Sequence, residues 1–499
     1  MLEIVNTKYG KVKGYPGNNQ FITVFKGIPF AKPPIGDLRW REPKKLEPWD
    51  GILNAYKYAS IPWQDRFSSE GGILAANEFY VRDYDRDEDC LYLNIFTPAK
   101  NKDEKLPVAI YIHGGGYETG YSYLNAYDGE SFAKEGIVYI TITYRLNVFG
   151  FLAHEELDKE SENNSSGNYG LLDQVAAVNW VFENIENFGG DPNKVVLMGQ
   201  SAGGSSVQNL IETDLLENKI KRAIMQSGGG FNYKGALEPL DHETAKNFGK
   251  SFFEFIKVSS IYEARKIPAN KLLEQYIEFK KVNNNKLMFI PNIDDYSLKE
   301  ESTNFLKSGK HPDIDYLIGA TSDEMRDKSI IVDEKSVENF AERRFERDVA
   351  KDFIEKMQDY KDEYFNDNIG DEMRAATVAF CENQIRIGYR PAYLYRFNYV
   401  PPGAEKIGAH HSVEHHYVFK TLNRSNRDYK LKDYKYALLL SKLWANFIKN
   451  GNPSTEDFEW KPYEKSLKEA MLIEDKGIFM GKIKKNKKED YLIKYFLNK

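Results

Sequence analysis

The chain has 499 residues, a formal net charge of −6 and a sequence pI near 5.9. This acidic balance argues against a general attraction to nucleic acid, because phosphate backbones bind surfaces with an excess of lysine and arginine. No apolar run reaches the roughly 20 residues that a membrane-spanning helix needs, so no membrane partner is expected either.

The first informative element is a predicted strand at residues 108–112 that leads directly into a glycine cluster. The strand reads VAIYI, and the chain continues with His113, three glycines and Tyr117. Glycines let consecutive backbone N–H groups turn toward one point, where they can stabilise the oxygen of a tetrahedral intermediate. An ordinary glycine-rich turn after a strand is the alternative interpretation.

A second predicted strand leads into a Gly-x-Ser-x-Gly sequence within residues 195–203 (VVLMGQSAG). An apolar strand, this pentapeptide and a following helix are the pattern of a nucleophile elbow, a turn so tight that only small residues fit around the serine. The turn would expose the Ser201 hydroxyl and direct a helix N-terminus toward it. The backbone amides of Gly115, Gly116 and Ala202 are then the expected oxyanion hole.

Two polar motifs follow in the order that completes a serine hydrolase site. A third predicted strand at 316–318 precedes GATSDE at 319–324, and HHSVE occupies 410–414. A serine hydroxyl needs an imidazole to take its proton, and the imidazole needs a carboxylate that fixes its tautomer. Serine, acid and histidine in this chain order are typical of the α/β-hydrolase fold, with a central, mostly parallel sheet flanked by helices.

Further motifs along the chain resemble those of the type B carboxylesterases, a family that includes cholinesterases and bacterial para-nitrobenzyl esterases. They lie at residues 25–31 (FKGIPFA), 33–40 (PPIGDLRW), 88–94 (EDCLYLN), 144–151 (YRLNVFGF), 168–174 (NYGLLDQ), 188–192 (FGGDP), 226–228 (QSG), 444–447 (WANF) and 451–453 (GNP). The resemblance therefore covers nearly the whole chain. It implies a single catalytic domain over residues 1–499, with large loop and helical insertions around the site.

Matched to the family's pattern, Ser201 is the nucleophile, Glu324 the acid and His411 the general base. The spacing of the family's His-x-x-Glu motif and the aromatic-Val-Phe run after it both fit His411. Asp323 remains the rival acid and His410 the rival base. Adjacent residues on an extended chain point in opposite directions, which disfavours Asp323 once Glu324 faces the site.

Two further positions are expected to contact or support the substrate site. Ser227 matches the family's buried second serine, which supports the active-site hydrogen bonds, although a simple turn serine would have the same sequence. Gln200 stands where the family usually has glutamate. It keeps the shape and hydrogen bonding of that residue but removes its charge, which weakens the case for a cationic substrate such as a choline ester. The neighbouring His415 and His416 are expected to pack or to face solvent.

Cysteine usage is the second departure from the family. Secreted members usually bridge the cysteine of the Glu-Asp-Cys-Leu motif to an upstream cysteine, but this chain has only Cys90 and Cys381. Two cysteines in such a long chain indicate a reducing compartment and free, buried thiols. Because residues 1–5 also lack the features of a signal peptide, we expect the cytoplasm. Without the disulfide, residues 64–89 are expected to form either an untethered lid or a fixed loop on the rim.

Segments outside the catalytic motifs are expected to be structural. The resemblance implies two buried ion pairs, Arg39–Glu88 and Arg145–Asp173. Helical patterns occur at residues 173–185, 250–280 and 335–360. The last two lie within the stretches 230–290 and 325–395, which should form mostly helical insertions that shape the pocket. The basic run at 482–488 precedes a C-terminal helix, with Tyr491, Leu492, Tyr495 and Phe496 on one face. We expect this helix to dock on the domain with its lysines in solvent, rather than on a membrane.

The predicted activity is hydrolysis of small to medium, uncharged carboxylic esters through an acyl-enzyme on Ser201. Water is the second substrate, no metal or organic cofactor is expected, and the chain is expected to act as a monomer. The same motifs also allow a lipase, an amidase, a thioesterase or a non-catalytic cholinesterase-like scaffold. The intact triad and glycines argue against the scaffold, and the charge within residues 64–89 argues against the apolar lid of a lipase.

Overall fold

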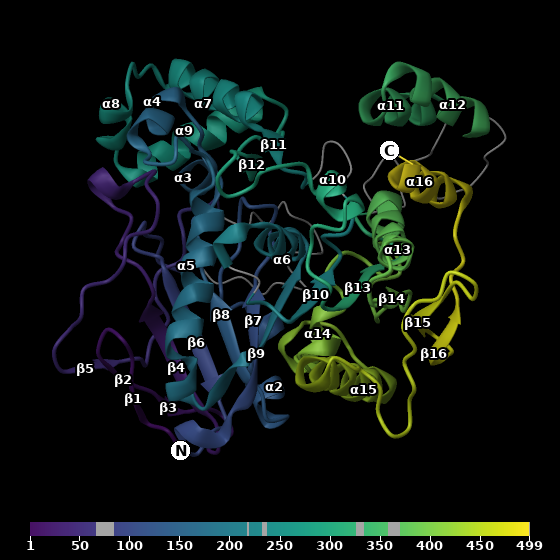
Figure 1. Cartoon of the computed structure of the whole chain (residues 1–499), viewed down its shortest axis with the longest axis horizontal. Helices are drawn as coiled ribbons and strands as arrows, with labels where there is room; N and C mark the ends of the chain where they lie inside the picture. The colour runs from purple at the N-terminus through teal and green to yellow at the C-terminus, as the bar shows by residue number, and fades with distance from the viewer. Residues whose placement is uncertain (66–83, 217–218, 232–236, 326–333, 358–369, 499) are drawn as a thin grey trace.

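The computed structural model describes residues 1–65, 84–216, 219–231, 237–325, 334–357 and 370–498 (Figure 1). Its centre is an 11-stranded sheet with the order β16 (Gly477–Lys482), β15 (Glu469–Glu474), β14 (Tyr393–Phe397), β13 (Asp315–Thr321), β10 (Arg222–Gln226), β9 (Gly190–Gln200), β7 (Leu106–Ile112), β8 (Val138–Ile142), β6 (Tyr92–Thr97), β4 (Thr23–Pro29) and β3 (Tyr15–Pro16). All neighbouring strands from β15 to β8 are parallel, whereas β16 at one edge and β6, β4 and β3 at the other pair antiparallel. The predicted central, mostly parallel sheet is confirmed.

Helices cover both faces of this sheet, because the strands present apolar side chains to both sides. Along β9, Val195 and Leu197 pack on one face, while Val196 and Met198 pack on the other. The first face is covered by α5 (Tyr169–Asn184), α6 (Ala202–Glu212) and α13 (Gly370–Arg386), and the second by α2 (Glu130–Lys134), α14 (His415–Val418) and α15 (Leu431–Asn450). A strand buried on both faces has a continuous apolar sequence, which is why residues 195–198 were recognisable.

The remaining elements lie outside the central sheet. They are the small sheets β1 (Ile4–Asn6), β2 (Lys11–Lys13) and β5 (Ile52–Asn54), and β11 (Leu240–Asp241) with β12 (Asn292–Ile293), and the helices α3 (Asn147–Phe151), α4 (Glu155–Glu160), α7 (His242–Ile256), α8 (Ile261–Arg265), α9 (Ala269–Val282), α10 (Ser302–Lys307), α11 (Glu334–Arg344), α12 (Arg347–Met357) and α16 (Lys487–Asn498). In Figure 1, α7, α8 and α9 form one group and α11 and α12 another, beyond α16. The two predicted helical insertions are thus confirmed in the described residues.

The predicted docking of the C-terminal helix on the domain is confirmed, because α16 packs against α13. Its residues Leu492, Ile493 and Phe496 are buried. The expectation that the lysines of the 482–488 run face solvent is wrong at Lys488 in the first turn of α16, whose side chain is fully buried with its Nζ 3.4 Å from Asp371 Oδ2. A buried ammonium needs such a partner, and the partner lies too far away in the sequence to be recognised there.

Both predicted ion pairs are confirmed. The shortest nitrogen–oxygen distances are 2.6 Å in Arg39–Glu88 and 2.7 Å in Arg145–Asp173. Cys90 and Cys381 are buried and free. The predicted lid or rim loop at 64–89 falls mostly outside the described residues, because 66–83 are not among them. Of the helices in the described part of the chain, none is both long and apolar enough to cross a membrane.

The helical insertion after β10 is fastened to the rest of the molecule by His242, the first residue of α7. One ring nitrogen, Nε2, lies 3.0 Å from Asp158 Oδ2, and the other, Nδ1, lies 2.7 Å from Asn292 Oδ1. The Asn292 side-chain nitrogen donates to the carbonyl of Ser166, so its oxygen is the atom that faces the ring. Both ring nitrogens therefore donate, and the imidazole is protonated. Burial opposes this charge, but the bonds to Asp158 and Asn292 outweigh it and raise the pKa of His242 above 6.5.

Stability is therefore expected to fall as pH rises through the raised pKa of His242. A group with a raised pKa holds its proton more tightly in the native state, so its stabilisation is complete below the ordinary pKa near 6.5 and is lost above the native one. Lys246 is the other cation near Asp158, at 3.8 Å, and it keeps its charge over this range. We expect the Tm difference between the wild type and His242→Gln to shrink from pH 6 to pH 9. A difference that stays constant would contradict a charged His242.

Candidate active site

Ser201 occupies the turn between β9 and α6 with φ 57° and ψ −131°. A positive φ is costly for any residue with a Cβ atom, and it persists only where the surroundings enforce it. A Cβ on Gly199 would lie 2.2 Å from the carbonyl oxygen of Gly203, and a Cβ on Gly203 would lie 2.1 Å from that of Ile112. The glycines are thus needed for the turn, and the structure has the backbone expected of a nucleophile elbow.

His411 and Glu324 meet through a hydrogen bond between the imidazole Nδ1 and the carboxylate Oε2. The other carboxylate oxygen accepts from the amide of Thr321 at 2.8 Å. Burial works against the charge on Glu324, but His411 and the neighbouring Ser227 hydroxyl outweigh it and lower its pKa. Burial likewise acts to lower the pKa of His411, and Glu324 outweighs it and raises that pKa. The carboxylate is therefore ionised and able to stabilise an imidazolium.

The second nitrogen of His411 contacts Gln200 rather than the serine. The side-chain nitrogen of Gln200 lies 3.2 Å from His411 Nε2. Because Nδ1 donates to Glu324, Nε2 of a neutral ring accepts a hydrogen bond from the Gln200 side-chain amide. In the described residues no hydrogen bond joins Ser201 to His411, although both line the same cavity. Catalytic hydrogen bonds are often loose without substrate and tighten in the complex.

Neither rival residue takes part in this arrangement. The Asp323 carboxylate accepts from the amide of Ala409 at 2.9 Å, and the Asp323 amide donates to the Ala409 carbonyl at 3.0 Å. Asp323 therefore fixes the backbone just before His411. His410 directs Nδ1 to the carbonyl of His411 at 3.0 Å and Nε2 toward Arg427 at 3.5 Å. The structure thus brings Glu324, and not Asp323, to the imidazole of His411.

The glycine loop after β7 adopts the conformation that a side chain would prevent. Gly115 has φ 108° and Gly116 has φ 65°. A Cβ on Gly115 would lie 2.1 Å from the carbonyl oxygen of Thr119. Within the described part of the chain, neither glycine amide donates a hydrogen bond. Ala202 is the first residue of α6, where a backbone N–H has no acceptor within the helix. All three amides can therefore serve a ligand.

Contacts from two distant segments hold this loop. Gln64 and Gly120 exchange hydrogen bonds, with the Gln64 side chain donating at 2.9 Å and accepting at 2.8 Å. The buried carboxylate of Glu118 accepts from Tyr276 and lies 3.1 Å from Lys280 Nζ, both on α9. The loop is thus fixed in place before a substrate arrives, as electrostatic stabilisation of an oxyanion requires.

Ser201, His411 and the glycine loop line a cavity of about 450 Å³. It is lined by Tyr111, Gly114, Gly115, Gly116, Thr119, Gly120, Leu124, Tyr127, Gln200, Ser201, Leu237, Leu287, Met325, Met373, His411, Ser412 and His415. None of these lining residues is an aspartate, glutamate, lysine or arginine. Ser227 is not among these lining residues; it acts to lower the pKa of Glu324, although its buried hydroxyl makes no hydrogen bond of ordinary geometry in the described part of the chain.

Sequence reasoning missed several polar residues of this wall, among them Tyr111 and His415. Tyr111 lies on β7, and its hydroxyl is 2.7 Å from His415 Nε2. His415 was expected to pack or to face solvent; it is buried and lines the cavity. His416 is buried too, with Nδ1 2.9 Å from the hydroxyl of Thr421. The clustered histidines near His411 were a signal that more than one of them approaches the site.

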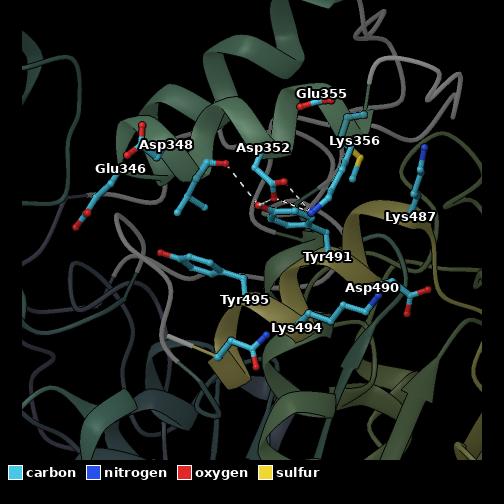
Figure 2. A pocket seen from close by; sticks show the side chains of 13 residues that line it. Glu346, Asp348, Asp352, Glu355, Lys356, Lys487, Asp490, Tyr491, Lys494 and Tyr495 are labelled. Atoms are coloured by element: carbon cyan, nitrogen blue, oxygen red, sulfur yellow. Dashed lines mark hydrogen bonds and ion pairs between the residues drawn. The ribbon is translucent and has the colours of Figure 1, made fainter.

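A larger cavity of about 1020 Å³ lies between α12 and α16 (Figure 2). Its lining includes acidic and basic side chains from both helices, and the Tyr491 hydroxyl there donates to Asp352 at 2.8 Å. No serine, cysteine or histidine is among its described lining residues. Its described lining therefore offers no serine or cysteine beside an imidazole, whereas the smaller cavity has both Ser201 and His411 on its wall.

Comparison with known proteins shows the family and the fold of this chain. The model of the carboxylesterase family matches residues 2–492. The para-nitrobenzyl esterase of Bacillus subtilis (strain 168) is 32% identical over 493 residues, which cover 95% of each chain. The fumonisin B1 esterase of Sphingopyxis macrogoltabida is 32% identical over 90% of this chain and 82% of its own. A solved PNB esterase structure has a TM-score of 0.85 at 29% identity and covers 99% of both chains, which confirms the predicted α/β-hydrolase fold.

Proposed function

Because the chain belongs to the carboxylesterase family and hydrolyses carboxylic esters, we propose that Ser201, His411 and Glu324 carry out this reaction through an acyl-enzyme. One observation carries the proposal: the buried His411–Glu324 pair and the strained Ser201 face one cavity without charged carboxylate or ammonium groups in its described wall. The Asp323 and His410 side chains bond elsewhere, which leaves one acid and one base for the roles.

The first half of the reaction transfers the acyl group to the enzyme. His411 exchanges its contact with Gln200 for one with Ser201 and takes the hydroxyl proton as the serine oxygen attacks the ester carbonyl. The amides of Gly115, Gly116 and Ala202 hold the oxyanion. Losing one donor of this kind costs about 2.7–4 kcal/mol of transition-state stabilisation.

The second half returns the enzyme to its starting state. The imidazolium of His411 gives its proton to the departing alcohol, so the ester bond breaks while the acyl group stays on Ser201. Water, deprotonated by the same imidazole, then attacks the acyl carbon and releases the acid. Glu324 holds the His411 tautomer and stabilises the imidazolium throughout, and Ser227 supports Glu324.

We propose small to medium, uncharged esters as substrates. The cavity of about 450 Å³ has aliphatic and methionine side chains on its described wall, among them Leu124, Leu287 and Met373. Burying a charged group against such a wall is unfavourable. The amide of Gln200 also lacks the negative charge that would attract a cationic alcohol.

Three organisational features complete the proposal. Residues 1–499 form one catalytic unit, because the proposed catalytic groups come from positions as distant in the sequence as Gly115 and His411. The chain acts as a monomer, since it supplies the triad and the oxyanion amides without a partner. It works in a reducing compartment, the cytoplasm, in keeping with the free Cys90 and Cys381.

Hydrolysis of a p-nitrophenyl acyl series from C2 to C16 tests the substrate class. We expect turnover to be greatest for short to medium chains, and background turnover from Ser201→Ala. Ser205→Ala is the matched control, because Ser205 is also buried but lies outside the cavity wall. A long-chain optimum would indicate a lipase. Turnover of amides alone would indicate an amidase, and turnover of thioesters alone would indicate a thioesterase. Full activity in Ser201→Ala would refute the nucleophile.

A further inference from the structure

Charged side chains gather in the interior where α13, α16 and β14 meet. Five of them are each less than 5% exposed: Asp371, Glu372, Arg396, Lys488 and Glu489. Moving charges out of water is expensive, and replacing a buried ion pair with apolar residues of similar size is often neutral or stabilising. Burial of so many charges therefore calls for a reason other than stability.

Ion pairs connect these side chains across the elements. Arg396 Nη2 of β14 lies 2.8 Å from Glu489 Oε1 of α16, and Lys488 Nζ lies 3.4 Å from Asp371 Oδ2 of α13. At the periphery, Arg344 Nε of α11 lies 3.1 Å from Glu372 Oε1. The C-terminal helix is thus joined to α13 and to the central sheet through buried charges.

Arg374 of α13 connects this network to the turn that carries the acid. Its guanidinium pairs with Asp371 and, through Nε, lies 3.5 Å from Glu489 Oε2. Its Nη1 donates to the backbone carbonyl of Ser322. That carbonyl lies two residues before Glu324, in the turn whose Thr321 amide also binds the Glu324 carboxylate.

The same guanidinium is electrostatically coupled to the acid itself. Burial acts against its charge, but Asp371, Glu489 and Glu324 outweigh it and raise the pKa of Arg374. The preceding residue of α13, Met373, lines the cavity. A displacement of Arg374 would therefore affect both the Glu324 carboxylate and the cavity wall at Met373.

We propose that Arg374 is a positioning residue for the hydrolysis, held by Glu489 of α16 so that the turn at Ser322 places Glu324 against His411. The C-terminal helix is then part of the support of the active site. This inference rests on the proposed role of Glu324 as the acid. Arg374 contacts no reacting atom, so its effect is on the turnover step rather than on substrate binding.

Kinetics of Arg374→Met, Arg374→Lys and Arg344→Met test the proposal. A misplacement of about 1 Å far from the chemistry can cost 10²-fold in rate, so we expect kcat of Arg374→Met to fall roughly 10- to 100-fold with KM nearly unchanged. Arg374→Lys, which keeps the charge, should recover part of kcat. Arg344→Met breaks a pair to the same buried network without touching the Ser322 turn, so its Tm should fall while kcat stays near the wild-type value.

Two outcomes would overturn the proposal. One is a wild-type kcat in Arg374→Met. The other is a kcat loss in Arg344→Met as large as that in Arg374→Met, with kcat falling in parallel with Tm in both variants. If Arg374→Met does not fold, Glu489→Gln provides the second test. It loosens the guanidinium from α16, and we expect a smaller loss of kcat in the same direction. Failure of the proposed function has a different signature, because Ser201→Ala would then retain turnover.

Discussion

Replacing His411 with alanine is expected to lower kcat by about 10⁶-fold, the order of loss seen when histidine is removed from a serine–histidine–acid triad. Among the described histidines, His411 alone both bonds to Glu324 and lines the cavity, so no neighbouring imidazole can take the serine proton in its place. Glu324→Gln keeps the volume of the acid but disturbs the tautomer of the ring, and we expect a loss of about 10⁴-fold. Steady-state hydrolysis of a short p-nitrophenyl ester measures both effects.

His410→Ala is the matched control for this result. His410 is the adjacent residue of the same loop, but its ring bonds to a carbonyl and approaches Arg427. Its removal should cost little kcat beyond any change in stability, which a parallel Tm measurement records. If His410→Ala lost as much activity as His411→Ala, the base would be assigned wrongly. The double variant Ser201→Ala/His411→Ala should be no slower than either single one, because the two residues act as a unit.

The largest expected loss of stability follows from Asp173→Asn. The Asp173 carboxylate is fully buried and accepts from the Arg145 backbone at 3.1 Å and from its Nε and Nη2 at 2.7 Å each. Asparagine leaves the buried guanidinium of Arg145 without its counter-charge. Breaking a buried pair in this way costs about 3–5 kcal/mol. The free energy of unfolding from urea titrations, followed by tryptophan fluorescence, should fall by that amount.

An exposed pair provides the comparison. Lys8 and Glu183 lie 2.8 Å apart, with side chains 52% and 34% exposed. Water screens such a pair, so Glu183→Gln should leave the free energy of unfolding nearly unchanged. Equal losses in the two variants would show that burial does not decide the outcome. Replacing Arg145 and Asp173 together with apolar residues should restore part of the stability that Asp173→Asn loses.

The backbone of the site could be predicted where local constraints act within a few residues. The strand before Ser201 is apolar on consecutive positions because both of its faces are buried, and the glycines around it are dictated by carbonyl oxygens about 2 Å from any added Cβ. The helix predicted from residue 173 begins earlier, at Tyr169. Its first turn includes Gly170, and the low helix propensity of glycine explains why this start was not predicted. Sequence patterns therefore predicted the elements better than their ends.

Contacts between distant segments could not be predicted in this way. The bond of Gln200 to His411, the place of His415 in the cavity wall and the burial of Lys488 all depend on which residues meet after folding. A polar residue looks the same in sequence whether its partner is a water molecule or a buried carboxylate. The family resemblance suggested the triad and marked Gln200 as a departure, but it did not indicate that Gln200 contacts His411.

The order of strands in the central sheet has a consequence for how the enzyme becomes active. β9, which leads to Ser201, pairs with β7 and β10, while β8 lies on the far side of β7. Parallel neighbours of this kind join distant stretches of chain, so the entropy of loop closure delays their formation. Ser201 follows β9 and Glu324 follows β13, and β10 lies between these strands, so the serine and the acid reach their native positions when β10 has paired with both. Ester turnover should therefore return last during refolding, later than helical signal or compaction, and it reports complete assembly.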